Sequence, residues 1–282
     1  MDGVGGFKLS LYSQCDTVAH SELGSMNVIK VVLPDVPTHG PARESCIKEH
    51  RAALSRFQLL GRTFTFFGMK TDHNMANTRA FLIAEKEPGP NPRWRSADEA
   101  RQLLADFGSL KDVSKEGRRL EHAFSSTHRA LADHTFIDQG MLQLDDQRQL
   151  GQLLDELRAR PPVPEGEAHV FLFDDIHGTG FDAKGKRALM TDGNGLISSN
   201  LSSTFPRVSS GLCREDSEGA PLATQMRLWL KGSLDKGVLT TDPQLPPGYL
   251  LIRKSNRKIH GTEGCAARKQ GISRLEVSSR SH

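Results

Sequence analysis

The chain has 282 residues, of which 37% are hydrophobic and 25% are charged, and its formal net charge is +3, as in an ordinary globular protein of one large domain or two smaller ones. No apolar run approaches the roughly 20 residues of a membrane-spanning helix, and residues 1–10 lack the charged segment and apolar core of a secretory signal. The four cysteines form no CxxC pair, so we expect an intracellular protein with reduced thiols and no membrane partner.

The first 165 residues are expected to contain a leader and then a mixed region of strands and helices. Residues 1–55 are rich in glycine, proline and polar side chains, apart from one apolar stretch at 28–33, and are treated as a poorly determined leader. Residues 56–165 form the mixed region. Within it, the alternating, aromatic segment 62–68 predicts a strand.

Two helices are predicted in the mixed region. The first begins after Ser96, because Ser96 and Glu99 have the spacing of a capping box, and Gly108 can end it. Its apolar residues have the i, i+3, i+4, i+7 spacing of one buried face: Ala100, Leu103, Leu104 and Phe107. The second covers residues 146–160 and stops at Pro161-Pro162. Its apolar face consists of Leu150, Leu153, Leu154 and Leu157.

From residue 166 onward, the pattern changes to short strands separated by turns. Candidate strands are 170–173, 188–191, 226–230, 237–241 and 249–253. Asp192-Gly193 and the proline-rich segment 243–248 mark turns between them. We therefore expect an α+β fold, with a helical N-terminal half followed by a mostly β part over residues 166–282.

Positive charge is concentrated in the last third of the chain. Residues 225–274 contain ten lysines and arginines and three acidic residues, a net charge of +7, so the rest of the chain carries −4. Such asymmetry is typical of a surface that faces a polyanion. A solvated basic face explains the charge equally well.

Segment 180–186 has the GxxxxGK spacing of a phosphate-binding P-loop. A P-loop needs a serine or threonine after the lysine to hold magnesium, whereas Arg187 follows here, and no helix pattern continues the segment. A basic hairpin loop between two strands is therefore the favoured interpretation. A P-loop nucleotidase is the least favoured of the functions considered.

Other residues could ligate a metal by type but not by spacing. His122, His128 and His134 recur every six residues, which does not place them on one helix face, so structural or surface roles are favoured. Asp145-Asp146 lies where a helix N-cap is expected. Asp174-Asp175 follows a strand, and its role stays open between metal ligand and structural pair.

Lys236 and Lys258 each lie beside a candidate strand in the basic segment, with a proline-rich turn between them. Neighbouring antiparallel strands would bring both ammonium groups toward one phosphate cluster, a task that suits lysine as a compact, mobile charge. From these residues alone, solvated surface lysines are the favoured alternative.

Four separated segments resemble, in order, the eukaryotic RNA-dependent RNA polymerases of RNA silencing. They are Gly61–Lys70, Ala105–Thr127 with Arg-Leu-x-x-x-Phe-Ser-Ser-Thr, Leu189–Ser198 with Thr-Asp-Gly-x-Gly-x-Ile-Ser, and Gln225–Ile259 with Gln-x-Arg and Lys-Gly-Val-Leu. Their order and spacing over about residues 55–280 make chance agreement remote. The chain departs from the family pattern at Asn256 and Ile259, and Lys231–Asp235 looks like a short insertion.

The resemblance implies the first double-psi β-barrel of a two-barrel polymerase core. Lys236 and Lys258 would then contact nucleotide phosphates or the RNA 3′ end, and Gln225 and Arg227 would line the same cavity. An earlier barrel turn would be shaped by Asp192, Gly193 and Gly195. The implied partners are a single-stranded RNA template, nucleoside triphosphates and the silencing machinery.

In this family, the second barrel holds Mg²⁺ on three closely spaced aspartates. The sequence has no Asp-x-Asp-x-Asp, so we expect an incomplete catalytic region without metal ligands, inactive alone, from a truncated or split gene or a degenerate copy. The alternative from another class is a non-catalytic RNA-binding fragment or pseudoenzyme, whose basic face binds backbone phosphates without chemistry.

Overall fold

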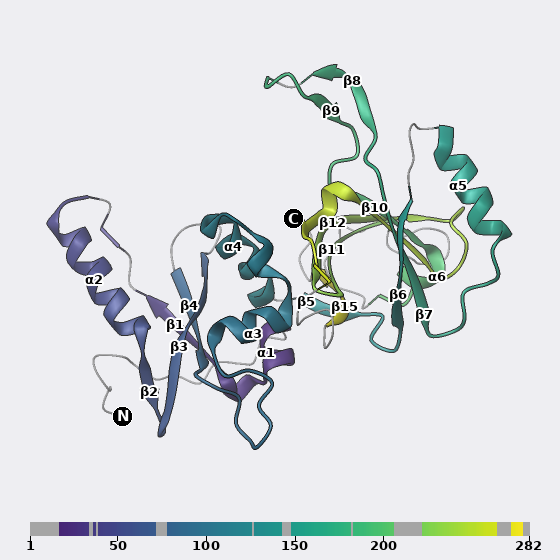
Figure 1. Cartoon of the computed structure of the whole chain (residues 1–282). Coiled ribbons are helices and arrows are strands. Elements are labelled where there is room, and N and C mark those ends of the chain that lie inside the picture. The colour runs from purple at the N-terminus through teal and green to yellow at the C-terminus, as the bar shows by residue number, and fades with distance from the viewer. Residues whose placement is uncertain are drawn as a thin grey trace.

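The computed structural model describes residues 17–33, 36–37, 39–71, 78–125, 127–142, 148–181, 183–205, 222–263 and 272–278. It shows an α+β fold in which an N-terminal part lies beside a C-terminal part built mainly of strands (Figure 1). No helix among the described residues is both long and apolar enough to cross a membrane.

The N-terminal part is an antiparallel sheet with helices on both faces. In sheet order, its strands are β1 (Val28–Leu33), β4 (Thr78–Ala84), β3 (Arg62–Thr71) and β2 (Phe57–Leu59). Successive side chains of β4 alternate between two cores. Leu82 shares one core with Leu54 of α2 (Pro41–Ser55). Ile83 shares the other with Leu23 of α1 (Val18–Leu23).

The predicted strand at 62–68 is confirmed as part of β3, whereas the helical N-terminal half is not confirmed, because strands form its centre. A strand buried on both faces is continuously apolar, so β4 lacks the alternation by which strands are recognised in sequence. The predicted leader, residues 1–55, contains α1, β1 and α2. The domain boundaries stay predictions.

The capped helix near residue 96 is confirmed, but its predicted end is wrong. The Oγ of Ser96 accepts a hydrogen bond from the backbone N of Glu99 at 3.2 Å, and α3 covers Ala97–Leu104. Ala105 is extended, so Phe107 lies in a separate 3₁₀ turn, η3 (Phe107–Ser109). Phe107 is nevertheless buried. The chain then forms α4 (Val113–Leu120) and the 3₁₀ helix η4 (Glu121–Phe124).

The C-terminal part is one mixed sheet. Its main path runs in the order β5 (Thr127–Ala130), β15 (Ser273–Ser278), β11 (Ala223–Leu230), β12 (Ser233–Asp242), β10 (Asn194–Ser198), β13 (Tyr249–Arg253), β7 (Glu167–Phe173) and β6 (Thr135–Leu142). The short strand β14 (Arg257–Ile259) also pairs with β12. The pairs β10–β12, β7–β13 and β6–β7 are parallel, and the other pairs are antiparallel.

This sheet wraps around a single core. Ala130 of β5 and Phe136 of β6 belong to opposite ends of the strand order, yet they share one apolar cluster with Leu228 of β11. Figure 1 shows the strands of this sheet curving toward a closed, barrel-like form. The short helix α6 (Ser199–Ser202) adds Leu201 to this cluster, whereas α5 (Arg148–Ala159) packs with Phe171 in a neighbouring cluster. The sheet is therefore barrel-like, while the double-psi crossing stays a prediction.

The predicted strands 170–173, 226–230, 237–241 and 249–253 are confirmed within β7, β11, β12 and β13. The predicted strand 188–191 is shorter than expected, because β9 (Arg187–Leu189) pairs with β8 (His177–Phe181) in a separate hairpin and ends before residue 190. The predicted second helix is confirmed as α5, although residues 143–147, including Asp145-Asp146, lie outside the described residues.

The two parts share a core and polar contacts. Trp229 of β11 belongs to the same apolar cluster as Phe124 of η4. Beside it, the carboxylate of Asp106 accepts hydrogen bonds from the backbone N of Thr262 at 2.9 Å and from its Oγ1 at 2.6 Å. The backbone N of Asp106 donates to the carbonyl of Gly232. Residues from the N-terminal part are thereby held against β11, β12 and β14.

Candidate functional site

Arg227 and Lys236 lie on one face of the barrel-like sheet, and Lys258 lies near Lys236. Arg227 on β11 is the direct cross-strand partner of Lys236 on β12. On the next pair of strands, Asp235 faces Arg257 and forms an ion pair with it. The register shifts beside this pair, which leaves Lys258 as the extra residue of a β-bulge, and its charge acts on Lys236, so the two lysines lie near each other. The sheet therefore brings together the two lysines that the sequence singled out.

Gln225 also belongs to this face, because it precedes Arg227 by two residues on β11. Its side chain is exposed. Of Lys231–Asp235, which looks like an insertion in the sequence, the first two residues form a tight hairpin turn and the others belong to β12. Leu230 pairs with Ser233, and both turn residues, Lys231 and Gly232, have positive φ.

The N-terminal part adds Lys70 of β3, Arg119 of α4 and His122 of η4 to the same place. His122 is buried, and its pKa is lowered to about 2. Burial is the largest cause, and the charges of four cations follow: Lys236, Arg227, Arg119 and Lys70. His122 is thus a neutral imidazole at neutral pH. We call Lys70, Arg119, Arg227, Lys236 and Lys258 the basic cluster.

The neighbouring positive charges affect the pKa of Lys236. Partial burial lowers the pKa of Lys236, and the nearby charges of Arg227 and Arg119 lower it further. Lys258 acts in the same direction, while Glu121 opposes them. Because the neighbouring cations disfavour the charged form of Lys236, a bound anion would relieve this repulsion.

The Nε–H group of Arg227 is buried and its hydrogen-bonding capacity is unsatisfied among the described residues. Glu276 on β15 is its cross-strand partner and raises its pKa, but burial is the larger effect and lowers the pKa. The buried carboxylate of Glu276 instead accepts hydrogen bonds from Thr127 and Arg274. The described residues provide no partner for the buried Nε of Arg227. A buried N–H of this kind is costly unless a ligand or water accepts from it.

The turn at Asp192-Gly193 is locked against β12 and the 3₁₀ turn η5 (Lys254–Asn256). The backbone N of Gly193 donates to the Oγ of Ser255 at 2.8 Å. The carbonyl of Gly193 accepts from the Nδ2 of Asn256 and from the backbone N of Val238, both at 2.8 Å. Asn256 stands where the family pattern has methionine, and its buried side chain holds this turn in place. Asp192 is exposed in the same turn.

Two glycines allow this close packing. A Cβ on Gly237, directly after Lys236, would lie 2.1 Å from the carbonyl oxygen of Gly193. A Cβ on Gly195 would lie 2.5 Å from the carbonyl oxygen of Leu251. Neither distance is possible without moving a strand. Gly195 of the Thr-Asp-Gly-x-Gly motif and Gly237 of the Lys-Gly motif are thus required by the approach of one backbone to another, whereas Gly193 is required by its positive φ of 70°.

Asp174-Asp175, which the sequence left open, is a structural pair. The Oδ2 of Asp175 accepts from the backbone N of Ser255 at 2.8 Å, and its Oδ1 accepts from the hydroxyls of Ser255 and Thr191. Asp174 forms an ion pair with Lys254. The Nζ of Lys258 donates to the carbonyl of Ser255. The aspartate pair therefore fixes the turn that leads to Lys258.

The remaining sequence candidates lie elsewhere. The segment 180–186 belongs to the β8–β9 hairpin and is followed by a strand, which confirms the basic hairpin over the P-loop. His128 is exposed on β5, and His134 lies in a turn before β6. Within the described ranges, no three His, Cys, Asp or Glu side chains are grouped as a metal ion requires. The basic cluster itself, rich in cations, does not fit a divalent cation.

Sequence reasoning missed part of this site. Lys70, Arg119 and His122 lie inside the resembling segments, but nothing in their spacing indicates that they meet Lys236. Their assembly depends on packing between the two parts of the molecule. What the assembled site can do chemically is bind phosphate: it supplies cations and an unpaired N–H, and no nucleophile with an adjacent base.

Comparison with known proteins gives consistent results. The family model described as RNA dependent RNA polymerase matches residues 12–282. Probable RNA-dependent RNA polymerase 3 from Oryza sativa subsp. japonica is 36% identical over 85 residues, which are 30% of this chain and 7% of that protein. The structure of the RNA dependent RNA polymerase QDE-1 from Thielavia terrestris matches 93% of this chain and 24% of that chain, with 17% identity and a TM-score of 0.58. The chain therefore spans a quarter or less of each of these proteins.

Proposed function

Because the chain belongs to the RNA-dependent RNA polymerase family, we propose that it forms the phosphate-binding side of an RNA-directed RNA polymerase active site. The full enzyme would copy a single-stranded RNA template from nucleoside triphosphates. The observation that carries this proposal is the basic cluster, which gathers residues from all but one of the resembling segments around Lys236.

Within this site, Lys236 and Lys258 would contact the phosphates of the incoming nucleotide or the RNA 3′ end. Their support is their proximity and the repulsion that the neighbouring cations exert on Lys236, which a bound polyanion would relieve. Arg227 would use its unpaired Nε on the same phosphates, and Gln225 would line the cavity. Asp192, Gly193 and Gly195 would shape the turn that holds the lysine strands, and the hydrogen bonds of Gly193 support this role.

Catalysis needs more than this site. In nucleotidyl transfer, Mg²⁺ activates the attacking hydroxyl and neutralises the leaving pyrophosphate. The described residues do not fit that ion, and the 282-residue sequence has no Asp-x-Asp-x-Asp. We propose that the metal ligands belong to another segment of the polymerase and that this chain alone adds no nucleotides.

A role in RNA silencing, in which double-stranded product becomes the precursor of small interfering RNA, rests on the sequence resemblance. In this role, the protein would also act with partners from the RNA-silencing machinery. A non-catalytic RNA-binding protein is the alternative, favoured because the described residues include no group of three side chains that could hold a metal ion.

Lys236→Ala and Lys258→Ala test the proposal in a polymerase that contains this chain together with an aspartate-bearing segment. Each variant should lose about 100-fold in the rate of nucleotide addition, the cost of one lost charge-stabilising donor in an active site. Template-directed incorporation of labelled nucleotides measures the rate, and thermal melting checks the fold. Lys48→Ala, which removes an exposed lysine on α2, is the matched control.

Wild-type rates in both variants would contradict the assignment of the lysines. To distinguish the polymerase from the non-catalytic RNA-binding protein, the purified chain is incubated with RNA, nucleotides and Mg²⁺ or Mn²⁺. Template-directed incorporation under these conditions would show that the metal ligands lie within the 282 residues. If the assembled polymerase also stays inactive while RNA binding persists, the non-catalytic function replaces the proposed one.

A further inference from the structure

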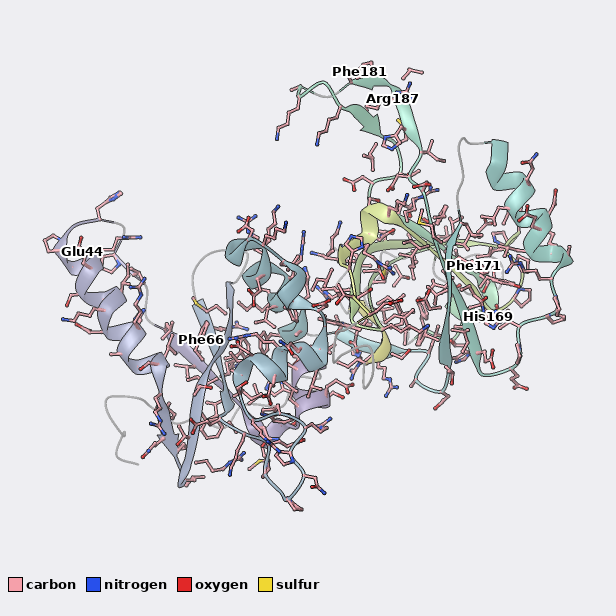
Figure 2. All side chains as sticks on the ribbon, viewed as in Figure 1. Glu44, Phe66, His169, Phe171, Phe181 and Arg187 are labelled. Atoms are coloured by element: carbon pink, nitrogen blue, oxygen red, sulfur yellow. The ribbon has the colours of Figure 1, made fainter. Side chains whose placement is uncertain are left out.

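The β8–β9 hairpin stands away from the barrel-like sheet (Figure 1). Its outer end carries Phe181 and Arg187, which Figure 2 shows far from the rest of the molecule. Phe181 is 68% exposed, and Met190 at the base is 69% exposed. A large aromatic side chain held so far into solvent makes no contribution to a core. Large apolar side chains that are exposed together on a protruding hairpin are candidates for binding another molecule.

The chemistry at the outer end combines an aromatic ring with cations. Phe181 is the cross-strand partner of Arg187. Lys184 and Lys186 are exposed in the turn between the strands. With Asp182 as the only acidic residue between positions 177 and 190, this stretch has a net charge of +2. Aromatic rings that stack on bases, beside cations that bind phosphates, are the common device for single-stranded nucleic acid.

The base of the hairpin is joined to the basic cluster. The backbone N of Met190 donates to the carbonyl of Ile176 at 2.8 Å, and the backbone N of Ile176 donates to the Oγ1 of Thr191 at 2.9 Å. That hydroxyl reaches Asp175, which holds Ser255 and, through it, the turn leading to Lys258. The hairpin is therefore anchored to the same turn as one of the site lysines.

We propose that the β8–β9 hairpin is a binding arm for single-stranded RNA, which stacks an unpaired base on Phe181 and holds backbone phosphates with Lys184, Lys186 and Arg187. This inference rests on the proposed function, because it supposes an RNA strand at the basic cluster. Charge favours RNA over a protein partner, since the centres of protein interfaces are depleted of lysine. The segment that resembles a P-loop thus binds phosphates by a different geometry.

Two variants of the full chain test the arm, with fluorescence anisotropy of a labelled oligouridine as the measurement. The triple variant Lys184→Ala/Lys186→Ala/Arg187→Ala should bind about tenfold more weakly, and the slope of log affinity against log salt should fall by about 2, at roughly 0.7 per phosphate contact on single strands. Phe181→Leu, which keeps an apolar side chain but removes the ring, should also weaken binding about tenfold. An oligouridine with 4-thiouridine should crosslink to the peptide that contains Phe181.

The charge control is Arg43→Ala/Lys48→Ala/Arg51→Ala, which removes three exposed cations from α2 and should leave RNA affinity unchanged. Lys236→Ala is measured in the same assay. If it weakens binding while the hairpin variants bind as the wild type does, the arm is refuted and the proposed function stands. If Phe181→Leu binds normally and no crosslink forms there, the arm is equally refuted, and the apolar surface fits a protein partner. If neither Lys236→Ala nor the hairpin variants change affinity, both proposals fail.

Discussion

Gly237→Ala should destabilise the protein by at least about 4 kcal/mol, a loss reserved for changes that the structure cannot absorb. The added methyl carbon would lie 2.0 Å from the Nδ2 of Asn256 and 2.1 Å from the carbonyl oxygen of Gly193. The first atom belongs to the buried side chain of Asn256 and the second to the backbone, so neither can move without a loss of stability. Relief of the clash would break the hydrogen bond between Asn256 and Gly193 and would separate Lys236 from the turn behind it.

Urea unfolding of the purified chain measures this loss. Gly117→Ala is the matched control, because Gly117 lies within α4, and a Cβ there meets nothing within 4 Å. The same substitution should stabilise the protein there by about 0.5–1 kcal/mol, since alanine is the better helix former. Equal stabilities for Gly237→Ala and the wild type would show that β12 and the Gly193 turn do not pack as described.

Arg257→Ala should cost about 3–5 kcal/mol, the usual penalty for leaving one partner of a buried ion pair alone. Asp235 is fully buried, and its Oδ1 and Oδ2 accept from the Nε and Nη2 of Arg257 at 2.9 and 3.1 Å. Without the guanidinium, the carboxylate has lost both donors. The double variant Asp235→Leu/Arg257→Met, which removes both charges, should recover most of the stability.

The pH dependence of this loss has a definite sign. Burial already raises the pKa of Asp235, and removal of the Arg257 charge raises it further. A carboxyl whose pKa is higher in the folded than in the unfolded protein weakens the fold once the pH exceeds the unfolded pKa, about 4. Because the unfolded pKa is common to both proteins, the deficit of Arg257→Ala comes from the difference between their folded pKa values, and it should be larger at pH 7 than at pH 4. Asp155→Ala, which breaks an exposed pair with Arg158, should cost under about 1 kcal/mol at either pH.

Local patterns in the sequence predicted local structure well. The capping box at Ser96, the leucine face of α5 and the strand β13 were all recognised because their signals lie within a few residues. The failures have a common cause. β4 is buried on both faces and β10 begins with Asn194-Gly195, so neither has the alternation of a half-buried strand. Pairing with distant strands, which no local pattern encodes, forms them.

The residues of the candidate site were likewise predictable from the sequence only in part. Lys236 and Lys258 could be singled out because they lie in a charged segment and in resembling motifs. Their convergence with Lys70 and Arg119 depends on packing between the two parts of the molecule. The aspartates 174 and 175 could not be assigned, because their partners, Lys254 and Ser255 respectively, lie 80 residues away. A carboxylate has the same sequence signature whether it holds a metal or a backbone turn.

The closed base of the β8–β9 hairpin affects how this region can vary between relatives. Since Ile176, Met190 and Thr191 join the two ends of the hairpin with hydrogen bonds, insertions or deletions between them leave β10 in its register. The entropy cost of a longer closed loop grows only slowly with its length. The reach of the hairpin can therefore differ between relatives while the strands of the barrel-like sheet keep their positions.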